Sequence, residues 1–297
     1  ICSKNDDSAA REPFEKHPEM VLRMSDFVVF YANWSNKCDN ILLIKEALNI
    51  GLDSIVFIDD NPFERNMVRT ILPDVTVPEM PEDPVDWIPY LSDLNLFEVA
   101  SVSEEDFNRT KLYQAEALRH HEQACHPTEA EFLCSLKMKA NIEPFTEFNI
   151  PRISQLTQRS NQFNLRTIRY DERAIAKVAS DSAYLSFAVT LSDKFGSHGL
   201  VSVVVLEKRS SKEIFVDTWL MSCRVLKRGL ERTVLNQIVA LAGKHGYEYV
   251  SAEYVPTNKN ALVRSLLSDL GFQKNDNEWR LKIDGFEPLS TFIQVNT

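Results

Sequence analysis

The chain has 297 residues, of which 44% are hydrophobic and 26% are charged, a composition typical of globular proteins and sufficient for two domains. Thirty-three basic and forty-three acidic residues give a formal net charge of −10, which disfavours binding to nucleic acid or to an anionic membrane surface. Uninterrupted apolar stretches are only a few residues long, so we expect neither a membrane-spanning segment nor a secretory leader.

Cysteine and glycine usage narrows the possibilities further. The five cysteines are odd in number and irregularly spaced, which predicts free thiols in a reducing cytosol, hence a cytoplasmic protein, instead of a disulfide framework. Only eight glycines are present, and Gly51 is the only one among the first 195 residues. Because no Gly-X-Gly occurs, a dinucleotide-binding fingerprint and a Walker loop are both excluded.

The first part of the chain alternates strands and helices. It begins with Ile1 instead of Met, and its first three residues resemble the end of a buried strand, so we expect a fragment that has lost an upstream segment. Capping residues, a proline at a helix start and apolar runs predict a helix that starts near residue 5, strands at 27–30 and 54–58, and helices at 37–48 and 62–71. Such alternation indicates a parallel sheet covered by helices.

The second part of the chain follows a different pattern. Residues 73–100 are acidic and rich in proline, which indicates a connection, and a capped amphipathic helix is predicted from residue 103 to about 122. The elements predicted after it are helices at 151–159, 171–180, 229–244 and 260–270 and strands at 184–191, 200–208, 213–219, 247–254 and 279–283. Adjacent strands followed by alternating elements indicate an α+β domain with a mixed sheet. We therefore expect domains at 1–100 and 128–297, joined by a linker helix at 101–127.

Two adjacent carboxylates follow the strand predicted at 54–58. Asp59 and Asp60 stand at its carboxyl end, directly before a helix that starts with proline. In open α/β sheets ligands bind at this edge, and adjacent carboxylates remain ionised beside a cation, so the pair predicts a Mg²⁺ site. The alternative is that one carboxylate caps the following helix while the other is solvated.

Two further residues are predicted at the same edge of the sheet. Ser3 ends the first strand, and Lys37 opens a helix. A hydroxyl, a lysine and a carboxylate pair together are suited to phosphoryl transfer.

The order Ser3, Lys37, Asp59-Asp60 resembles the second, third and fourth motifs of the haloacid dehalogenase (HAD) phosphohydrolases. That resemblance implies an aspartyl nucleophile in a DxDx[TV] motif upstream of Ile1. We therefore expect no phosphatase activity from the chain as given.

A basic turn precedes the helix predicted at 229–244. Arg224, Lys227 and Arg228 stand beside the start of this helix, where free N–H groups favour an anion such as pyrophosphate. The alternative is that these cations pair with surface acids. The turn resembles the R-x-x-G-x-G/A loop of GNAT acetyltransferases, which implies binding of coenzyme A or phosphopantetheine through Arg224, Lys227, Arg228 and Gly229.

The chain departs from the GNAT pattern at two places. Lys227 stands where the first glycine of the loop would be, and its side chain opposes a close approach of the backbone to a ligand. Leu266 and Leu267 occupy the helix that often carries a tyrosine acting as general acid in that superfamily. These departures disfavour amine acetylation through such an acid.

The two halves together resemble the FkbH-like proteins, which are HAD subfamily IIIC. The stretches that carry this resemblance are "ICSKND", "FEKHPEMVLR", "NIGLDSIVFIDDNPFERNMVR", "LTQRSNQFNL", "DTWLMSCRVL" and "YVPTNKNALV". The resemblance implies that a glyceryl unit is taken from 1,3-bisphosphoglycerate, phosphate is removed, and the unit is delivered to the phosphopantetheine thiol of an acyl carrier protein. Such proteins supply units for polyketide biosynthesis. The partners implied are a phosphorylated three-carbon substrate and the carrier protein.

Acyl transfer to a thiol is well served by an enzyme cysteine, and two candidates remain open. Cys223 lies beside the basic turn, and Cys2 adjoins Ser3, although the alternation of side chains along a strand places Cys2 towards the core if Ser3 faces the crevice. For each, a buried inert thiol is the alternative. Asn161, in "LTQRSNQFNL", and Asn260 are candidates for contacts with the pantetheine arm, whereas a helix cap is the structural alternative for the first stretch.

Three other interpretations remain. The residues His120, His121, Cys125 and His126 fit no closed four-ligand zinc pattern, so we expect them to form the polar end of the linker helix. An acyl-CoA-dependent N- or O-acyltransferase with a purely structural HAD half is the alternative enzyme. A scaffold within a synthase complex is the non-enzymatic alternative.

Overall fold

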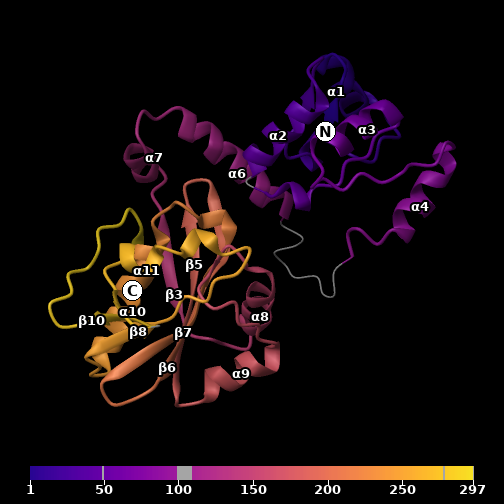
Figure 1. The fold of residues 1–297 in the computed structure, drawn as a ribbon. Helices are drawn as coiled ribbons and strands as arrows, with labels where there is room; N and C mark the ends of the chain where they lie inside the picture. The colour runs from indigo at the N-terminus through magenta and orange to yellow at the C-terminus, as the bar shows by residue number, and fades with distance from the viewer. Residues whose placement is uncertain (49, 99–108, 277, 297) are drawn as a thin grey trace. The chain divides into compact units, whose positions relative to one another are not determined.

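The computed structural model describes residues 1–48, 50–98, 109–276 and 278–296 (Figure 1). The chain forms two compact units, Ile1–Cys125 and His126–Thr297. The predicted fold class, an α/β chain with parallel pairing first and a mixed α+β sheet second, is confirmed. The predicted helix start at 103–106 lies outside the described residues.

Strand pairing in the first unit is parallel and short. Strand β1 (Cys2–Ser3) pairs with β2 (Tyr31–Ala32), and an isolated parallel bridge joins Val56 to Thr76. The strand predicted at 54–58 is reduced to this bridge, because Ser54 belongs to a 3₁₀ turn, Leu52–Ser54, and among the described residues only Ile55 and Phe57 exchange backbone hydrogen bonds with Thr76. The prediction of a strand at 27–30 was wrong, because Phe27 and Phe30 pack edge-to-face on each other and on Phe14. The apolar run therefore marks an aromatic cluster, and pairing begins one residue later.

Two helices of the first unit begin and end where the sequence predicted. These are α2 (Lys37–Leu48) and α3 (Pro62–Ile71), whose buried faces share a small core with Phe57. The other α-helices in the described part of the first unit are α1 (Asp7–Lys16), α4 (Trp87–Asp93) and α6 (Arg109–Ala124). Helix α4 lies in the segment predicted as a plain connection, because its neighbouring prolines mask the signal of a two-turn helix.

The second unit is built on a mixed nine-stranded sheet. Its strand order is β11-β3-β5-β6-β7-β8-β10-β9, with β4 paired to β7 at the side. The pairs β7–β8 and β11–β3 are parallel, and the other pairs are antiparallel. The strands are β3 (Lys139–Glu143), β4 (Phe163–Asn164), β5 (Tyr184–Asp193), β6 (Gly196–Lys208), β7 (Glu213–Met221), β8 (Tyr249–Ala252), β9 (Gln273–Asn275), β10 (Glu278–Lys282) and β11 (Gln294–Asn296).

Helices cover both faces of this sheet, and alternate residues of the central strands serve the two faces. On β6, Val203 packs with α8 (Ile150–Arg159) and α9 (Glu172–Ser180), which lie together in Figure 1. The adjacent Val204 packs in the larger core with α7 (Glu129–Ser135), α10 (Leu230–Lys244) and α11 (Leu266–Asp269). The helix predicted at 260–270 is instead a 3₁₀ turn, Ala261–Val263, followed by α11.

No membrane-crossing helix is found among the described residues, since none of their helices is both long and apolar enough.

Candidate active site

The candidate site of the first unit is centred on a buried ion pair. Asp59 follows the buried residue Phe57, and its Oδ2 contacts the Nζ of Lys37, the first residue of α2. The side chains of Lys37 and Asp59 are only 10% and 5% exposed. Each of these two buried groups has the other as its ion-pair partner, which offsets part of the cost of withdrawing it from water. The structure thus brings together two residues that lie 22 positions apart in sequence.

Local hydrogen bonds fix the direction of the Asp59 carboxylate. Its Oδ1 accepts a 2.9 Å bond from the backbone N–H of Asn61. Asn61 in turn caps α3, since its Oδ1 accepts from the backbone N–H of Phe63 at 2.9 Å, and Pro62 takes the first helical position. The helix cap is therefore Asn61 and neither aspartate, so the capping half of the structural alternative was wrong, whereas Asp60 is exposed to solvent as that alternative expected.

Asp60 contrasts with its neighbour. Its side chain is exposed, and within the described part of the chain its carboxylate has no hydrogen bond or ion pair. An ionised carboxylate accepts about four hydrogen bonds or metal contacts, so both aspartates keep free lone pairs. Mg²⁺ needs only one or two protein carboxylates, because water and substrate phosphate supply its other ligands. The two residues fit such an ion, with Lys37 placed to limit their mutual repulsion.

Ser3 is located at the end of β1, as predicted, and pairs with Ala32 of β2. The next residue, Lys4, forms a 2.6 Å ion pair with Glu64 of α3, which is itself buried. A second lysine–carboxylate pair therefore joins the end of β1 to the start of α3. The sequence analysis missed this pair, although its residues are adjacent to Ser3 and to the Asp-Asp-Asn-Pro turn.

The surroundings of Cys2 oppose a reactive thiolate. Burial is the largest influence and raises the pKa of its thiol, while Lys37 and the N-terminal ammonium of Ile1 lower it and the carboxylates of Asp59 and Glu64 raise it by smaller amounts. The Sγ atom lies 3.7 Å from the carbonyl oxygen of Lys37, to which it donates. A thiol held protonated is a poor nucleophile, so the geometry disfavours Cys2 as an acyl relay.

The basic turn of the second unit carries an exposed thiol. Cys223 is exposed and opens a 3₁₀ turn, Cys223–Val225, after β7. Arg224 Nε donates to Ser222 Oγ at 3.4 Å, whereas Arg228 is buried and its Nε lies 3.5 Å from the carbonyl oxygen of Arg224. The turn therefore offers a reachable cysteine, but it fixes one of its predicted ligand-binding arginines inside the protein.

Left-handed backbone shapes the end of this turn. Gly229 has φ +76° directly before α10, and a Cβ added there would meet nothing within 4 Å. Lys227 also adopts positive φ, at 63°, which is unusual for a residue with a side chain. The position where the GNAT pattern has glycine is thus occupied by a lysine that adopts a glycine-like conformation.

The two asparagines proposed for the pantetheine arm differ in accessibility. Asn161 is partly exposed, and its Oδ1 accepts a hydrogen bond from Arg169. Asn260 is fully buried, and its Nδ2 donates to the carbonyl oxygens of Asn164 at 3.0 Å and Val255 at 2.9 Å. Its Oδ1 accepts from the N–H of Thr257 at 2.7 Å. With its amide used inside the protein, Asn260 joins loops instead of facing a ligand.

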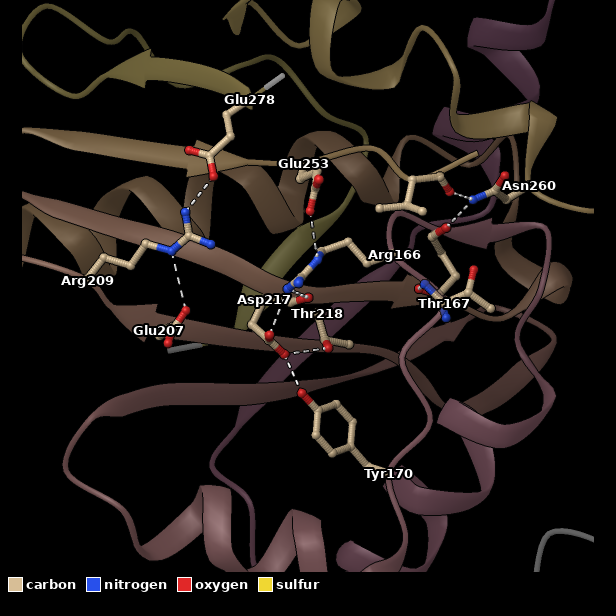
Figure 2. A network of polar contacts seen from close by, with 12 residues as sticks. Arg166, Thr167, Tyr170, Glu207, Arg209, Asp217, Thr218, Glu253, Asn260 and Glu278 are labelled. Atoms are coloured by element: carbon tan, nitrogen blue, oxygen red, sulfur yellow. Dashed lines mark hydrogen bonds and ion pairs between the residues drawn. The ribbon is translucent and has the colours of Figure 1, made fainter. Parts of the chain in front are cut away.

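A polar network lies where the parallel strands β7 and β8 separate, and the sequence analysis missed it. Asp217 and Glu253 are the first residues beyond the last paired positions, Val216 and Ala252. Figure 2 shows Arg166 between them, at 2.8 Å from Asp217 Oδ1 and 3.3 Å from Glu253 Oε2. Such a network connects loop and strand residues far apart in sequence, so local patterns carry no signal for it.

The same network includes Tyr170, whose hydroxyl donates to Asp217 Oδ2 at 2.5 Å, while Thr218 donates to that oxygen at 3.0 Å. Burial, followed by the hydrogen bond and charge of Asp217, raises the pKa of Tyr170 well above its ordinary value of 10.0. Asp217 therefore has protein partners on both oxygens, and Tyr170 stays un-ionised at neutral pH.

The segment 163–166 lies between the diverging strands. Strand β4 pairs with Met221 and Leu220 at the end of β7, and Val255, just after β8, donates its N–H to the carbonyl oxygen of Leu165 at 2.9 Å. The chain itself thus fills the space that opens beyond Val216 and Ala252. The strand ends of the second unit are occupied by protein groups.

Metal-ligand clusters are absent from the described residues, within which no three His, Cys, Asp or Glu side chains converge on a common ion position. The zinc alternative consequently gains no support. Of the residues considered for zinc, the Cys125 thiol donates to the backbone carbonyl of His121 at 3.4 Å, and the His126 ring packs near Phe132.

Comparison with known proteins gives partial similarities. No family model and no curated protein matches the chain. The N-terminal part of a Bacteroides fragilis protein, which contains a phosphatase domain and was crystallised with Mg, is 64% identical over 34% of this chain, with a TM-score of 0.34. This chain covers 27% of that polypeptide, about a quarter of its length.

Other similar structures are N-acetyltransferases. The Escherichia coli ribosomal-protein-S18-alanine N-acetyltransferase is 17% identical and covers 48% of this chain and 94% of its own, with a TM-score of 0.38. The Vibrio cholerae spermidine N-acetyltransferase in complex with CoA and spermine is 13% identical over 49% of this chain and 96% of its own, with a TM-score of 0.41. The similar proteins are thus a phosphatase-domain protein and acetyltransferases, each over part of the chain.

Proposed function

We propose that the protein transfers a glyceryl unit from 1,3-bisphosphoglycerate to the phosphopantetheine thiol of an acyl carrier protein, with release of phosphate. The first unit would bind the phosphorylated three-carbon substrate, and the second would receive the carrier arm. The observation that carries this proposal is the buried Lys37–Asp59 ion pair beside the exposed Asp60 carboxylate. Its cytosolic location, where acyl phosphates are made and thiols stay reduced, belongs to the same proposal.

In this proposal the strand-end corner binds phosphate with the help of a cation. Asp59 and Asp60 would hold Mg²⁺, which supplies charge neutralisation and Lewis acidity at phosphoryl oxygens when bound. Lys37 would orient the phosphate with an N–H that its contact with Asp59 leaves free, and Ser3 would add a hydroxyl donor. The Bacteroides fragilis phosphatase-domain protein that was crystallised with Mg and shares 64% identity over a third of this chain supports the choice of cation.

The acyl transfer step is assigned to Cys223. The thiolate would attack the acyl carbonyl, and the bond between carbonyl carbon and phosphate oxygen would break, so that the 1-phosphate leaves with the electron pair and a 3-phosphoglyceryl thioester forms. Water would cleave the remaining 3-phosphate ester, which releases the second phosphate and leaves the glyceryl thioester. The carrier thiol, as its thiolate, would then attack the enzyme thioester and release the Cys223 thiolate. Cys223 is exposed, whereas burial raises the pKa of Cys2, and this difference favours Cys223.

The basic turn would bind the carrier arm. Arg224 and Lys227 would supply positive charge for the phosphate of phosphopantetheine, and the backbone beside Gly229 would offer N–H groups at the start of α10. The same arrangement would accept the pyrophosphate of coenzyme A, which is why an acyl-CoA-dependent transferase remains the second candidate.

Phosphate release from 1,3-bisphosphoglycerate by the full-length protein tests the first step. We expect release that requires Mg²⁺ and falls at least about 100-fold in Asp60→Asn, because a carboxylate that holds the ion is lost. Asp74→Asn changes another exposed carboxylate of the same unit and should leave the rate unchanged. Equal rates in all three proteins, or release without Mg²⁺, would refute the proposed site.

Mass spectrometry of the intact protein tests the second step. We expect an acyl adduct that disappears in Cys223→Ser and persists in Cys134→Ser, since both cysteines are exposed but only Cys223 adjoins the basic turn. Acyl transfer from an acyl-CoA without phosphate release would instead favour the second candidate.

A further inference from the structure

One arginine of α3 contacts the backbone of the candidate metal corner. Arg65 Nη1 donates to the carbonyl oxygens of both Asp59, at 2.8 Å, and Asp60, at 3.0 Å. Arg65 is only 6% exposed and lies four positions after Asn61, the residue that caps α3. The side chain therefore reaches back from the helix to the turn that presents the two carboxylates.

This contact depends on a bend in the backbone at Asp60. In an extended strand successive carbonyl groups point in opposite directions, so the two N–H bonds of one Nη atom would not reach both. At Asp59 and Asp60 the chain bends, and the two carbonyls converge on one nitrogen. A planar guanidinium with fixed donors holds such a bend more firmly than a flexible ammonium does.

The charge of Arg65 has little other compensation among the described residues. Its ion-pair partner in the described part of the chain is Glu79, at 3.5 Å, whose side chain is 70% exposed. Glu79 is also bound by Arg69 at 2.8 Å. The Nε of Arg65 is buried and has no hydrogen-bond partner in the described part of the chain. A buried cation used chiefly on two backbone carbonyls points to a positioning task.

We propose that Arg65 is the positioning residue of the Mg²⁺ site, because it fixes the bend that directs the Asp59 and Asp60 carboxylates towards one ion. The proposal rests on the proposed function of the first unit. The proposal predicts that removing Arg65 weakens Mg²⁺ binding, whereas electrostatics alone predicts stronger binding. Removing a cation near a divalent metal strengthens metal binding by Coulomb's law, whereas loosening the bend weakens it.

Calorimetric titration of the full-length protein with Mg²⁺ alone measures whether each substitution raises or lowers the dissociation constant. We expect the dissociation constant to rise about tenfold in Arg65→Met and about threefold in Arg65→Lys, which keeps the charge but loses the planar fork. Arg69→Met is the matched control, since Arg69 lies on the same helix, shares Glu79 and does not contact the two carbonyls. Its dissociation constant should equal that of the wild type.

Circular dichroism at low temperature identifies the variants that fold, and either folded Arg65 variant suffices for the test. An unchanged or lower dissociation constant in that variant would overturn the positioning role. If the wild type binds Mg²⁺ and Asp60→Asn abolishes binding while the Arg65 variants match the wild type, only this inference fails. Absence of saturable Mg²⁺ binding in the wild type would refute the proposed function and this inference together.

Discussion

In both units acidic residues follow the point where parallel pairing stops, but the contacts of these residues differ. In the first unit, Asp59 is paired with Lys37 while the adjacent Asp60 stays exposed. In the second unit, Asp217 has protein partners on both oxygens, and Arg166 links it to Glu253. Parallel pairing stops before these residues at the Val56–Thr76 bridge in the first unit and at Val216–Ala252 in the second. This position alone therefore does not separate them.

What separates them is whether the polar groups are already satisfied. Polar groups that already have protein partners rigidify the fold, as Asp217 does with Arg166 on one oxygen and Tyr170 on the other. A corner that keeps an exposed carboxylate beside a buried ion pair can still bind a cation without breaking protein contacts. This difference supports the ligand-binding role proposed for the Asp59–Asp60 corner and is consistent with a structural role for the Asp217 network.

The largest expected effect concerns the buried ion pair of the first unit. Asp59→Asn leaves the Lys37 ammonium buried without its counter-charge, so we expect the free energy of unfolding to fall by about 3 kcal/mol. Asp60→Asn should change it by less than about 0.5 kcal/mol, because Asp60 is exposed. Urea denaturation measures both values. Equal losses would contradict the distinction drawn between the two neighbours.

The next effect concerns Asn260, whose amide joins the end of β4 to the loop that follows β8. Asn260→Ala leaves buried carbonyl and N–H groups without partners, so we expect a loss of about 2 kcal/mol in the free energy of unfolding. Asn258→Ala, two residues away and exposed, should be nearly neutral. A stable Asn260→Ala protein with weaker binding of coenzyme A would instead restore the ligand-binding role first predicted for this residue.

A smaller effect is expected at Tyr170. Loss of its hydrogen bond to the Asp217 carboxylate in Tyr170→Phe should cost about 1.5 kcal/mol near neutral pH. Since the pKa of Tyr170 is raised in the folded protein, its stabilisation is complete below the unfolded value of 10.0 and is lost as pH rises above it. The difference in unfolding free energy between wild type and Tyr170→Phe should therefore shrink from about pH 9 to about pH 11. A difference that grows over this range would show that the hydroxyl is not held protonated.

The smallest effects lie in the basic turn. Gly229→Ala should destabilise the protein by about 1 kcal/mol through backbone strain alone, because the added Cβ meets no atom within 4 Å. Lys227→Gly should stabilise it by about 0.5 kcal/mol, since relief of the left-handed strain exceeds the entropy that glycine adds to the unfolded chain. Thermal unfolding of both variants checks these opposite signs, and two changes of the same sign would refute the conformational argument.

The sequence was most informative where local chemistry decides the structure. Asn61 and Pro62 mark the start of α3, which is why its bounds could be predicted. The apolar run at 27–30 misled, because aromatic packing on Phe14 competes with strand pairing and leaves no trace in periodicity.

Contacts between residues far apart in sequence could be predicted only in part. The position of Asp59 at a strand end and of Lys37 at a helix start predicted that they would approach each other, and they form an ion pair. No local sequence pattern predicts that Arg166 links Asp217 to Glu253, or that the Asn260 amide bonds to Asn164 in β4. The roles of Ser3, Asp60 and Cys223 stay predictions until binding and activity are measured.

An anomalous difference map from crystals soaked in Mn²⁺, used as a substitute for Mg²⁺, tests the contrast between the two strand ends most directly. We predict a peak within coordination distance of the Asp59 and Asp60 carboxylates and none beside Asp217 and Glu253, since Arg166 lies between those two carboxylates. A peak at the Asp217–Glu253 strand end, or no peak at the Asp59–Asp60 corner, would contradict the account.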